Sequence, residues 1–312
     1  MTGLAPDPEE PDGPVGDNGD GTVSWRALLA ETAHRLGSDP TASAPASEAR
    51  WLIEEASGIE GSALELSLDS PATIRGVARL DAMVERRLGG EPIQYVLGHW
   101  SFRTLDLMCD GRVLIPRPET EQVVGWALDE MDRLLLARPE GHRMSVLDLG
   151  TGSGAIGLSV AKERPGTDVW LVDRSADALA VARANLSGLG MSGGRVRVLE
   201  GSWFDPLPED LVGRVDVVIS NPPYIAASEI LDPSVVDWEP SQALVSGPDG
   251  LECHRQILSG ASRWLADDGV VVLEIGATQA EAVVSLARDA GFGSAEVHSD
   301  HAGLPRCVVA RR

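Results

Sequence analysis

The sequence has few cysteines and no long apolar run, and both shortages exclude classes of protein. Its three cysteines, Cys109, Cys253 and Cys307, lie far apart in a chain of 312 residues. They form neither a disulfide framework nor a metal-binding spacing, which fits a reducing compartment, and no metal is expected. No apolar run approaches the ~18 residues of a membrane span. Because the N-terminus also carries no secretory signal, the sequence predicts a cytoplasmic protein without membrane contact.

Positive charge is also scarce. The chain has 26 Lys and Arg residues against 48 Asp and Glu, so its formal net charge is −22. Such a field repels phosphate backbones, and direct binding to nucleic acid is therefore not expected. The 43% of hydrophobic residues allow a sizeable core, and the length indicates about two domains. We expect a monomer.

Composition divides the chain into four segments. Residues 1–21 are acidic and rich in Gly and Pro, and they predict a disordered leader. Residues 22–90 carry apolar residues at helical spacing and predict a small helical bundle. Residues 91–112 predict a β-hairpin linker. Residues 113–312, which include a helix to about Leu136, predict an α/β domain.

The helical bundle is predicted to contain three helices, each with one apolar face. The last of them is expected over residues 70–88. Ser70 and Pro71 suit the N-cap and the first helical position, and Ile74 falls on the apolar face. These apolar faces predict a core, and nothing in this segment indicates catalysis.

Strands and helices alternate after residue 145. Strands are predicted at 145–149, 168–172, 196–200, 215–220, 270–275, 295–298 and 307–310. Helices are predicted at 155–163, 176–189, 251–266 and 278–290. This alternation is typical of a mostly parallel sheet with helices on both faces. The last two strands are joined by a short loop and should pair antiparallel. A ligand is expected outside the carboxyl ends of the strands.

A glycine-rich turn follows the first of these strands. Its residues are Gly150, Thr151, Gly152, Ser153 and Gly154. Glycines permit a sharp turn and close approach to a ligand, and the next helix begins with unpaired N–H donors. Asp173, at the end of the following strand, is placed to hold a ribose diol. Since Gly150-x-Gly152-x-x-Ala155 also fits the dinucleotide fingerprint, NAD remains an alternative on this turn alone.

Three further features favour S-adenosylmethionine over NAD. Gly154 comes one residue earlier than the third glycine of the dinucleotide pattern. Asp148 stands near the end of the strand, where methyltransferases commonly place an acid. Trp203 follows the third strand and offers an aromatic contact to adenine. S-adenosylmethionine is therefore the expected cofactor.

The most informative motif is Asn221-Pro222-Pro223-Tyr224, which follows a buried strand. The two prolines remove two backbone donors and fix two φ angles. The rigid turn that results can aim the Asn221 side chain and the Pro222 carbonyl at the two N–H bonds of a planar amino group, with Tyr224 packed against it. We predict catalytic roles for Asn221, Pro222 and Tyr224 and substrate binding by all four residues. The acceptor nitrogen could belong to adenine, cytosine or glutamine.

Several segments together resemble one family, the protein-(glutamine-N5) methyltransferases of peptide chain release factors (PrmC/HemK). They are residues 90–98, 114–121, the Gly150–Gly154 turn, Asn221–Tyr224, 239–251 and 300–306. The resemblance covers about Thr22 to Arg311. It implies a seven-stranded Rossmann-like class I S-adenosylmethionine-dependent methyltransferase domain preceded by the bundle and the hairpin. It also implies methylation of the side-chain amide nitrogen (N5) of the glutamine in the Gly-Gly-Gln motif of release factors.

The resemblance assigns roles to individual residues. It implies cofactor binding by Gly150, Thr151, Gly152, Ser153, Gly154, Asp173, Trp203 and Asn221. The helical bundle would help to recognise the release factor. Arg117 and Glu119 would either line the acceptor cleft or form a structural turn.

Two other functions are compatible with parts of the sequence. An adenine amino-group methyltransferase of DNA or RNA shares the Asn221–Tyr224 motif, but the net charge of −22 disfavours it. An S-adenosylmethionine-binding regulator or scaffold would use the helical bundle to dock a partner. The intact Asn221–Tyr224 motif disfavours that alternative.

Overall fold

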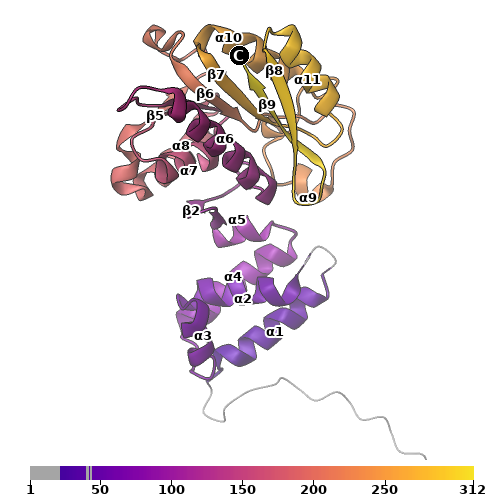
Figure 1. The fold of residues 1–312 in the computed structure, drawn as a ribbon. Helices are drawn as coiled ribbons and strands as arrows, with labels where there is room; N and C mark the ends of the chain where they lie inside the picture. Colours follow the sequence, from indigo (N-terminus) through magenta and orange to yellow (C-terminus); the bar gives the residue numbers. More distant parts are fainter. Residues whose placement is uncertain (1–21, 40–41, 43) are drawn as a thin grey trace, which may run out of the picture. The chain divides into compact units, whose positions relative to one another are not determined.

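The computed structural model describes residues 22–39, 42 and 44–312 (Figure 1). The predicted leader at residues 1–21 lies outside the described residues. The chain forms two compact units that divide between Leu97 and Gly98. Among the described residues, no helix combines the length and the apolar character that a membrane crossing requires.

The described part of the first unit is helical. Its helices are α1 (Trp25–Gly37), α2 (Pro45–Ser57), α3 (Gly61–Ser67), α4 (Ile74–Leu88) and α5 (Ile93–Leu97). The apolar faces of α1, α2 and α4 meet in one buried core, as their spacing predicts. Helices α3 and α5 were not predicted from the sequence, and α5 lies in the stretch predicted as part of the hairpin linker. At seven and five residues, both are shorter than the window of about 11–18 residues over which an apolar face can be recognised.

The start of α4 differs from the prediction. The helix begins at Ile74, and the hydroxyl of Thr73, not that of Ser70, caps it by accepting from the Gly76 N–H at 3.0 Å. The Ser70 carbonyl instead accepts from the Trp25 N–H at 3.3 Å, because this stretch pairs with the residues before α1. Ile74 is 92% exposed and is not a core residue.

The predicted hairpin is present but shorter than the predicted linker. Strands β1 (His99–Phe102) and β2 (Leu105–Met108) pair antiparallel. The turn is fixed by Arg103, which has a positive φ of 52°. Its guanidinium binds Glu163 at 2.6 Å, and its backbone N–H donates to Glu121 at 3.1 Å. These contacts attach the hairpin, which belongs to the second unit, to the helices that contain Glu121 and Glu163.

The second unit contains the α/β domain, all of which is described. Its further helices are α6 (Pro118–Ala137), α7 (Ala155–Glu163), α8 (Ala176–Gly188), α9 (Pro233–Val236), α10 (Glu252–Trp264) and α11 (Ala280–Asp289). Short 3₁₀ turns lie at Gly190–Arg195, Glu209–Leu211 and Ser241–Ala243. The strands are β3 (Ser145–Leu149), β4 (Asp168–Asp173), β5 (Val196–Glu200), β6 (Val215–Ser220), β7 (Leu265–Glu274), β8 (Ser294–Ser299) and β9 (Pro305–Arg311).

The seven strands form one sheet in the order β5-β4-β3-β6-β7-β9-β8. The first five are parallel, and β9 pairs antiparallel with both β7 and β8. The predicted fold class and the antiparallel last pair are therefore confirmed. Helices α6 and α7 cover one face of the sheet, and α10 and α11 cover the other (Figure 1). This double covering explains why β3 and β6 are buried along their whole lengths.

The order of the strands determines where the predicted site residues lie. The chain moves outward from β3 to β4 and β5, and then returns to β6 on the other side of β3. Neighbouring β3 and β6 are in register, with Asp148 opposite Ile219. The turn at Gly150 and the motif at Asn221 therefore leave the sheet side by side, at the switch point where such folds bind ligands.

Candidate active site

A cavity of about 280 Å³ lies at the carboxyl ends of the central strands. Of the residues singled out in the sequence, Gly150, Gly152, Asp173, Trp203, Asn221 and Pro223 line it. The remaining predicted site residues lie around this cavity without forming its wall. They are Thr151, Ser153, Gly154, Pro222 and Tyr224. The structure thus brings the glycine-rich turn and the Asn221–Tyr224 motif to the same cavity.

The glycine-rich turn needs its glycines for conformation and for space. Gly152 has φ +56°, and Gly154 has φ +86°, in the left-handed region that side chains rarely adopt. A Cβ on Gly154 would lie 2.8 Å from Leu158 Cδ1. The turn can therefore pass tightly into α7 only with glycine at this position.

Asp148 braces this turn from behind. Its Oδ2 accepts hydrogen bonds from the Thr151 hydroxyl at 2.6 Å and from the Gly157 N–H at 2.9 Å. Burial raises the pKa of the Asp148 carboxyl to about 6. A Cβ on Gly157 would lie 2.2 Å from Leu171 Cδ2, so glycine lets α7 approach the sheet. Asp148 holds the shape of the turn and does not line the cavity.

Asp173 joins the turn to the next connection. Its two carboxylate oxygens accept from the backbone N–H groups of Gly152 and Ser175, each at 2.9 Å. A carboxylate has about four acceptor positions, so lone pairs remain for a ligand in the cavity. The same side chain can therefore order the turn and bind hydroxyl groups.

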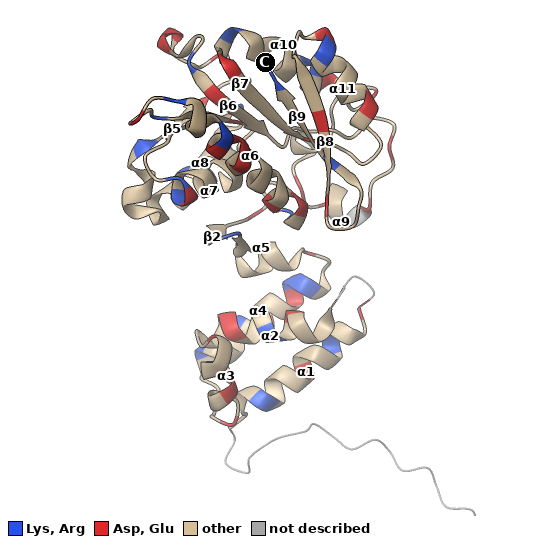
Figure 2. Ribbon diagram, viewed as in Figure 1, with Lys and Arg blue, Asp and Glu red and all other residues tan. Residues whose placement is uncertain are grey.

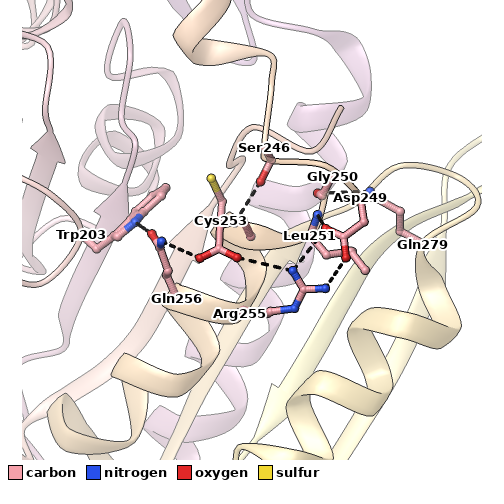
Figure 3. Close-up of polar contacts among 10 residues, drawn as sticks. Trp203, Ser246, Asp249, Gly250, Leu251, Cys253, Arg255, Gln256 and Gln279 are labelled. Atoms are coloured by element: carbon pink, nitrogen blue, oxygen red, sulfur yellow. Dashed lines mark hydrogen bonds and ion pairs between the residues drawn. The ribbon is translucent and has the colours of Figure 1, made fainter. Parts of the chain in front are cut away.

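Trp203 is held in place by α10. It has a positive φ of 45°, and its indole N–H donates to Gln256 Oε1 at 2.6 Å (Figure 3). Gln256 in turn donates to Glu252 at 2.9 Å, and both line the cavity. This pair was not predicted from the sequence, because a Glu and a Gln four residues apart also suit an ordinary exposed helix face.

Replacing Trp203 by alanine is expected to weaken S-adenosylmethionine binding about tenfold, since stacking of a base on an aromatic ring contributes ~1–3 kcal/mol. Trp203→Phe is the matched control, because it keeps a ring but loses the N–H bond to Gln256. It should bind within about threefold of wild type. Calorimetric titration measures both values. An unchanged affinity in Trp203→Ala would contradict the prediction that Trp203 contacts adenine.

Asn221 lies where β6 ends, and its side chain contacts α6. Its Nδ2 donates to Thr120 Oγ1 at 3.2 Å. Pro222 is buried behind it, while Pro223 faces the cavity. The preceding strand end is fixed to β3 by the Ser220 hydroxyl, which donates to the Leu149 carbonyl at 2.6 Å. The Asn221 amide is therefore carried on a rigid backbone.

The Tyr224 backbone is held by Gly250, just before α10, and by Gln279, just before α11. Its carbonyl accepts from Gln279 Nε2 at 2.8 Å. The same Nε2 donates to the Gly250 carbonyl at 3.3 Å (Figure 3). A Cβ on Gly250 would lie 2.4 Å from the Tyr224 carbonyl oxygen, and Gly250 has φ +74°. Burial raises the pKa of the Tyr224 phenol to about 12.

Arg117 and Glu119 do not line the cavity. The Arg117 guanidinium forms an ion pair with the buried Glu239, whose other carboxylate oxygen accepts from the Ile115 N–H at 3.1 Å. This contact ties the segment before α6 to the loop after Tyr224. It favours the structural alternative for Arg117.

Two family models match the sequence. The Methyltransferase small domain matches residues 125–236, and the PrmC N-terminal domain matches residues 27–98. The release factor glutamine methyltransferase of Gloeobacter violaceus is 42% identical over 269 residues, covering 85% of this chain and 90% of that protein. The one of Agrobacterium fabrum is 36% identical over 296 residues, covering 94% of this chain and 99% of that protein.

A solved structure with the same fold is the hMettl16 catalytic domain in complex with MAT2A 3′UTR hairpin 6. It aligns with a TM-score of 0.50 and 14% identity, over 75% of this chain and 81% of that one. The fold, the cavity and the family matches define a class I S-adenosylmethionine-dependent methyltransferase, so NAD is excluded as the cofactor. Within that class, the chain belongs to the release factor glutamine methyltransferase family.

Proposed function

We propose that this protein transfers a methyl group from S-adenosylmethionine to N5 of the glutamine in the Gly-Gly-Gln motif of release factors. The observation that carries the proposal is the shared cavity. Gly150 and Asp173 line it together with Asn221 and Pro223, so a cofactor and an acceptor bound there would be neighbours. The curated relatives are named for this activity.

The residues around the glycine-rich turn fit S-adenosylmethionine. Asp173 keeps carboxylate lone pairs for the ribose hydroxyls beyond the two backbone bonds that it accepts. Trp203 presents an aromatic surface for adenine, and Gly150 and Gly152 leave room for close approach. When bound, the cofactor supplies an electrophilic methyl group on a sulfonium.

The Asn221–Tyr224 motif suits an amide nitrogen as the acceptor. Such a nitrogen is a poor nucleophile, because its lone pair is delocalised into the carbonyl group. Asn221 Oδ1 and the Pro222 carbonyl accept its two N–H bonds and fix its orientation, which lowers the barrier to attack. No strong base is needed, since the nitrogen can release a proton to solvent after transfer. With its pKa raised to about 12, the Tyr224 phenol stays neutral and serves in packing.

The proposal extends to the first unit and to the partners. Residues 22–90 would help to recognise the release factor, and the protein would act in the cytoplasm as a monomer. It would make no direct contact with nucleic acid. The net charge of −22 supports this, and in the view of Figure 2 basic residues are interspersed with acidic ones on both units.

Incubating the protein with a release factor and S-adenosylmethionine is expected to add one methyl mass to the peptide that contains the Gly-Gly-Gln glutamine. Fragmentation by mass spectrometry locates the methyl group on the side-chain amide. A release factor with Gln replaced by Glu in that motif is the control and should remain unmodified. A parallel reaction with DNA and RNA should give no methylation. Transfer to nucleic acid, or none to a folded release factor, would contradict the proposal.

A further inference from the structure

Thr120 and Glu274 form a polar pair directly behind Asn221. Thr120 lies in the first turn of α6 and is 4% exposed, and Glu274 ends β7 and is 1% exposed. The register of β6 and β7 pairs Ser220 with Leu273, so Asn221 and Glu274 leave adjacent strands at the same level. Among the described residues, those that line the cavity include Asn221 but neither member of this pair.

The three side chains form a continuous hydrogen-bonded relay. Thr120 Oγ1 lies 2.7 Å from Glu274 Oε2 and 3.2 Å from Asn221 Nδ2. The second oxygen of Glu274 lies 3.5 Å from the Tyr224 hydroxyl. Hydrogen bonds therefore link this pair to the wall of the cavity through Asn221, and to Tyr224 beside it.

When the Glu274 carboxyl is ionised, the relay has a direction. An ionised carboxylate only accepts hydrogen bonds, so the single hydroxyl hydrogen of Thr120 is donated to Glu274. The Thr120 oxygen then has only lone pairs to offer to Asn221. The amide of Asn221 must turn its NH₂ group toward Thr120. Its Oδ1 then remains for another donor.

We propose that Thr120 and Glu274 are positioning residues that hold the Asn221 amide with its oxygen available to the acceptor N–H. This inference rests on the proposed function, because it assigns Asn221 Oδ1 to the glutamine amide. The oxygen and nitrogen ends of an amide side chain are nearly equal in shape, so without the relay the Asn221 amide could flip. A flipped Asn221 would present its NH₂ group to the N–H group of the acceptor, and two donors cannot form a hydrogen bond. The relay thus selects the orientation in which the site can bind an amino group.

Protonation of Glu274 would reverse the relay. Burial raises the pKa of the Glu274 carboxyl to about 7. The titratable or charged groups that face it are Glu119 on α6, Tyr224 after β6, His254 on α10, and Arg306 and Cys307 on β9. A protonated Glu274 can donate to Thr120, which then can donate to Asn221 Oδ1. Because the pKa of Glu274 is raised, its carboxyl becomes protonated as the pH falls below about 7. The productive orientation of the Asn221 amide is then lost.

Thr120→Val removes the hydroxyl at nearly constant volume and is expected to lower kcat on release factor at least tenfold. The dissociation constant of S-adenosylmethionine should stay within about threefold of wild type. Thr120→Ser restores the hydroxyl and should keep kcat within about threefold. A wild-type kcat in Thr120→Val, or an equal loss in both variants at equal thermal stability, would overturn the proposal.

Glu274→Gln provides a second test that does not depend on the fold of Thr120→Val. Wild-type kcat should fall by at least threefold when the pH is lowered from 8 to 6. The kcat of Glu274→Gln should not show this fall, because glutamine does not titrate. The side-chain NH₂ signal of Asn221 in the NMR spectrum, assigned by its absence in Asn221→Ala, should titrate near pH 7 in wild type and not in the variant. Identical pH behaviour in both proteins would overturn the proposal. Since the NMR measurement needs no methyl transfer, it separates failure of the relay from failure of the proposed function.

Discussion

Asn221→Ala is expected to lower kcat for methylation of release factor by about 10³-fold, with little change in the affinity for S-adenosylmethionine. The substitution removes the acceptor for one N–H of the glutamine amide while the rigid prolines keep the backbone in place. Removing a single preorganised polar group from an active site typically costs 10²–10³-fold in kcat. Single-turnover kinetics with a saturating cofactor concentration measure the chemical step directly.

Two further measurements on Asn221→Ala test whether the loss of kcat is specific to the chemical step. The thermal unfolding midpoint and the cofactor dissociation constant of Asn221→Ala should remain close to those of wild type, because Asn221 is only half-buried. A variant that turns over within tenfold of wild type would show that Asn221 does not orient the acceptor. A variant that loses cofactor affinity in proportion to its rate would show that Asn221 serves mainly in cofactor binding, the other role that the family resemblance implies for it.

Asp173→Ala is expected to raise the dissociation constant of S-adenosylmethionine by about 100-fold or more. Each hydrogen bond from a hydroxyl to the carboxylate contributes ~1.5–3 kcal/mol, and 1.4 kcal/mol corresponds to a tenfold change in affinity. The substitution also removes the acceptor for the Gly152 and Ser175 N–H groups, so the glycine-rich turn loses a brace. Isothermal titration of the purified protein measures the change.

Asp177→Ala is the matched control for Asp173→Ala. Asp177 is an exposed carboxylate four residues away on α8, so the same charge is removed without touching the cavity. Its cofactor affinity should stay within about twofold of wild type. Near-equal affinities for the Asp173 and Asp177 variants would mean that Asp173 serves the turn and not the cofactor. Such a result would leave the ribose without its proposed partner.

The central strands β3 and β6 could be predicted from the sequence because each is a short run of mostly apolar residues, whereas β7 begins at Leu265, five residues before the predicted strand and inside the predicted helix 251–266. Strand β3 and helix α7 have the predicted bounds, and β6 ends at the residue before Asn221 as expected. The errors fall where tertiary contacts decide. The Ser70–Pro71 pair has the residue types of a helix start, but an isolated β-bridge between Ser24 and Pro71 and the bond from the Trp25 N–H to the Ser70 carbonyl hold it outside the helix. Local propensity is weak beside such contacts.

The supporting residues of the site were less predictable than the residues that line it. Asn221 and Gly150 stand in unusual local sequences, whose backbone requirements are visible in the chain itself. Thr120 and Glu274 are ordinary residues, the first in a helix and the second at a strand end. They lie 101 and 53 positions from Asn221 in the numbering, and only the packing of α6 against β6 and β7 brings them together.

The sequence by itself determined the fold class, the glycine-rich turn with Asp173, and the Asn221–Tyr224 motif, because each depends on short-range backbone preferences and local periodicity. The tertiary structure alone decided that these elements share one cavity, that Asp148 braces the turn from behind, and that Gln256 orients Trp203. It also placed the buried carboxylate of Glu274 next to Thr120. The direction of a hydrogen bond depends on partners that folding brings together from distant positions, and no local pattern in the chain records it.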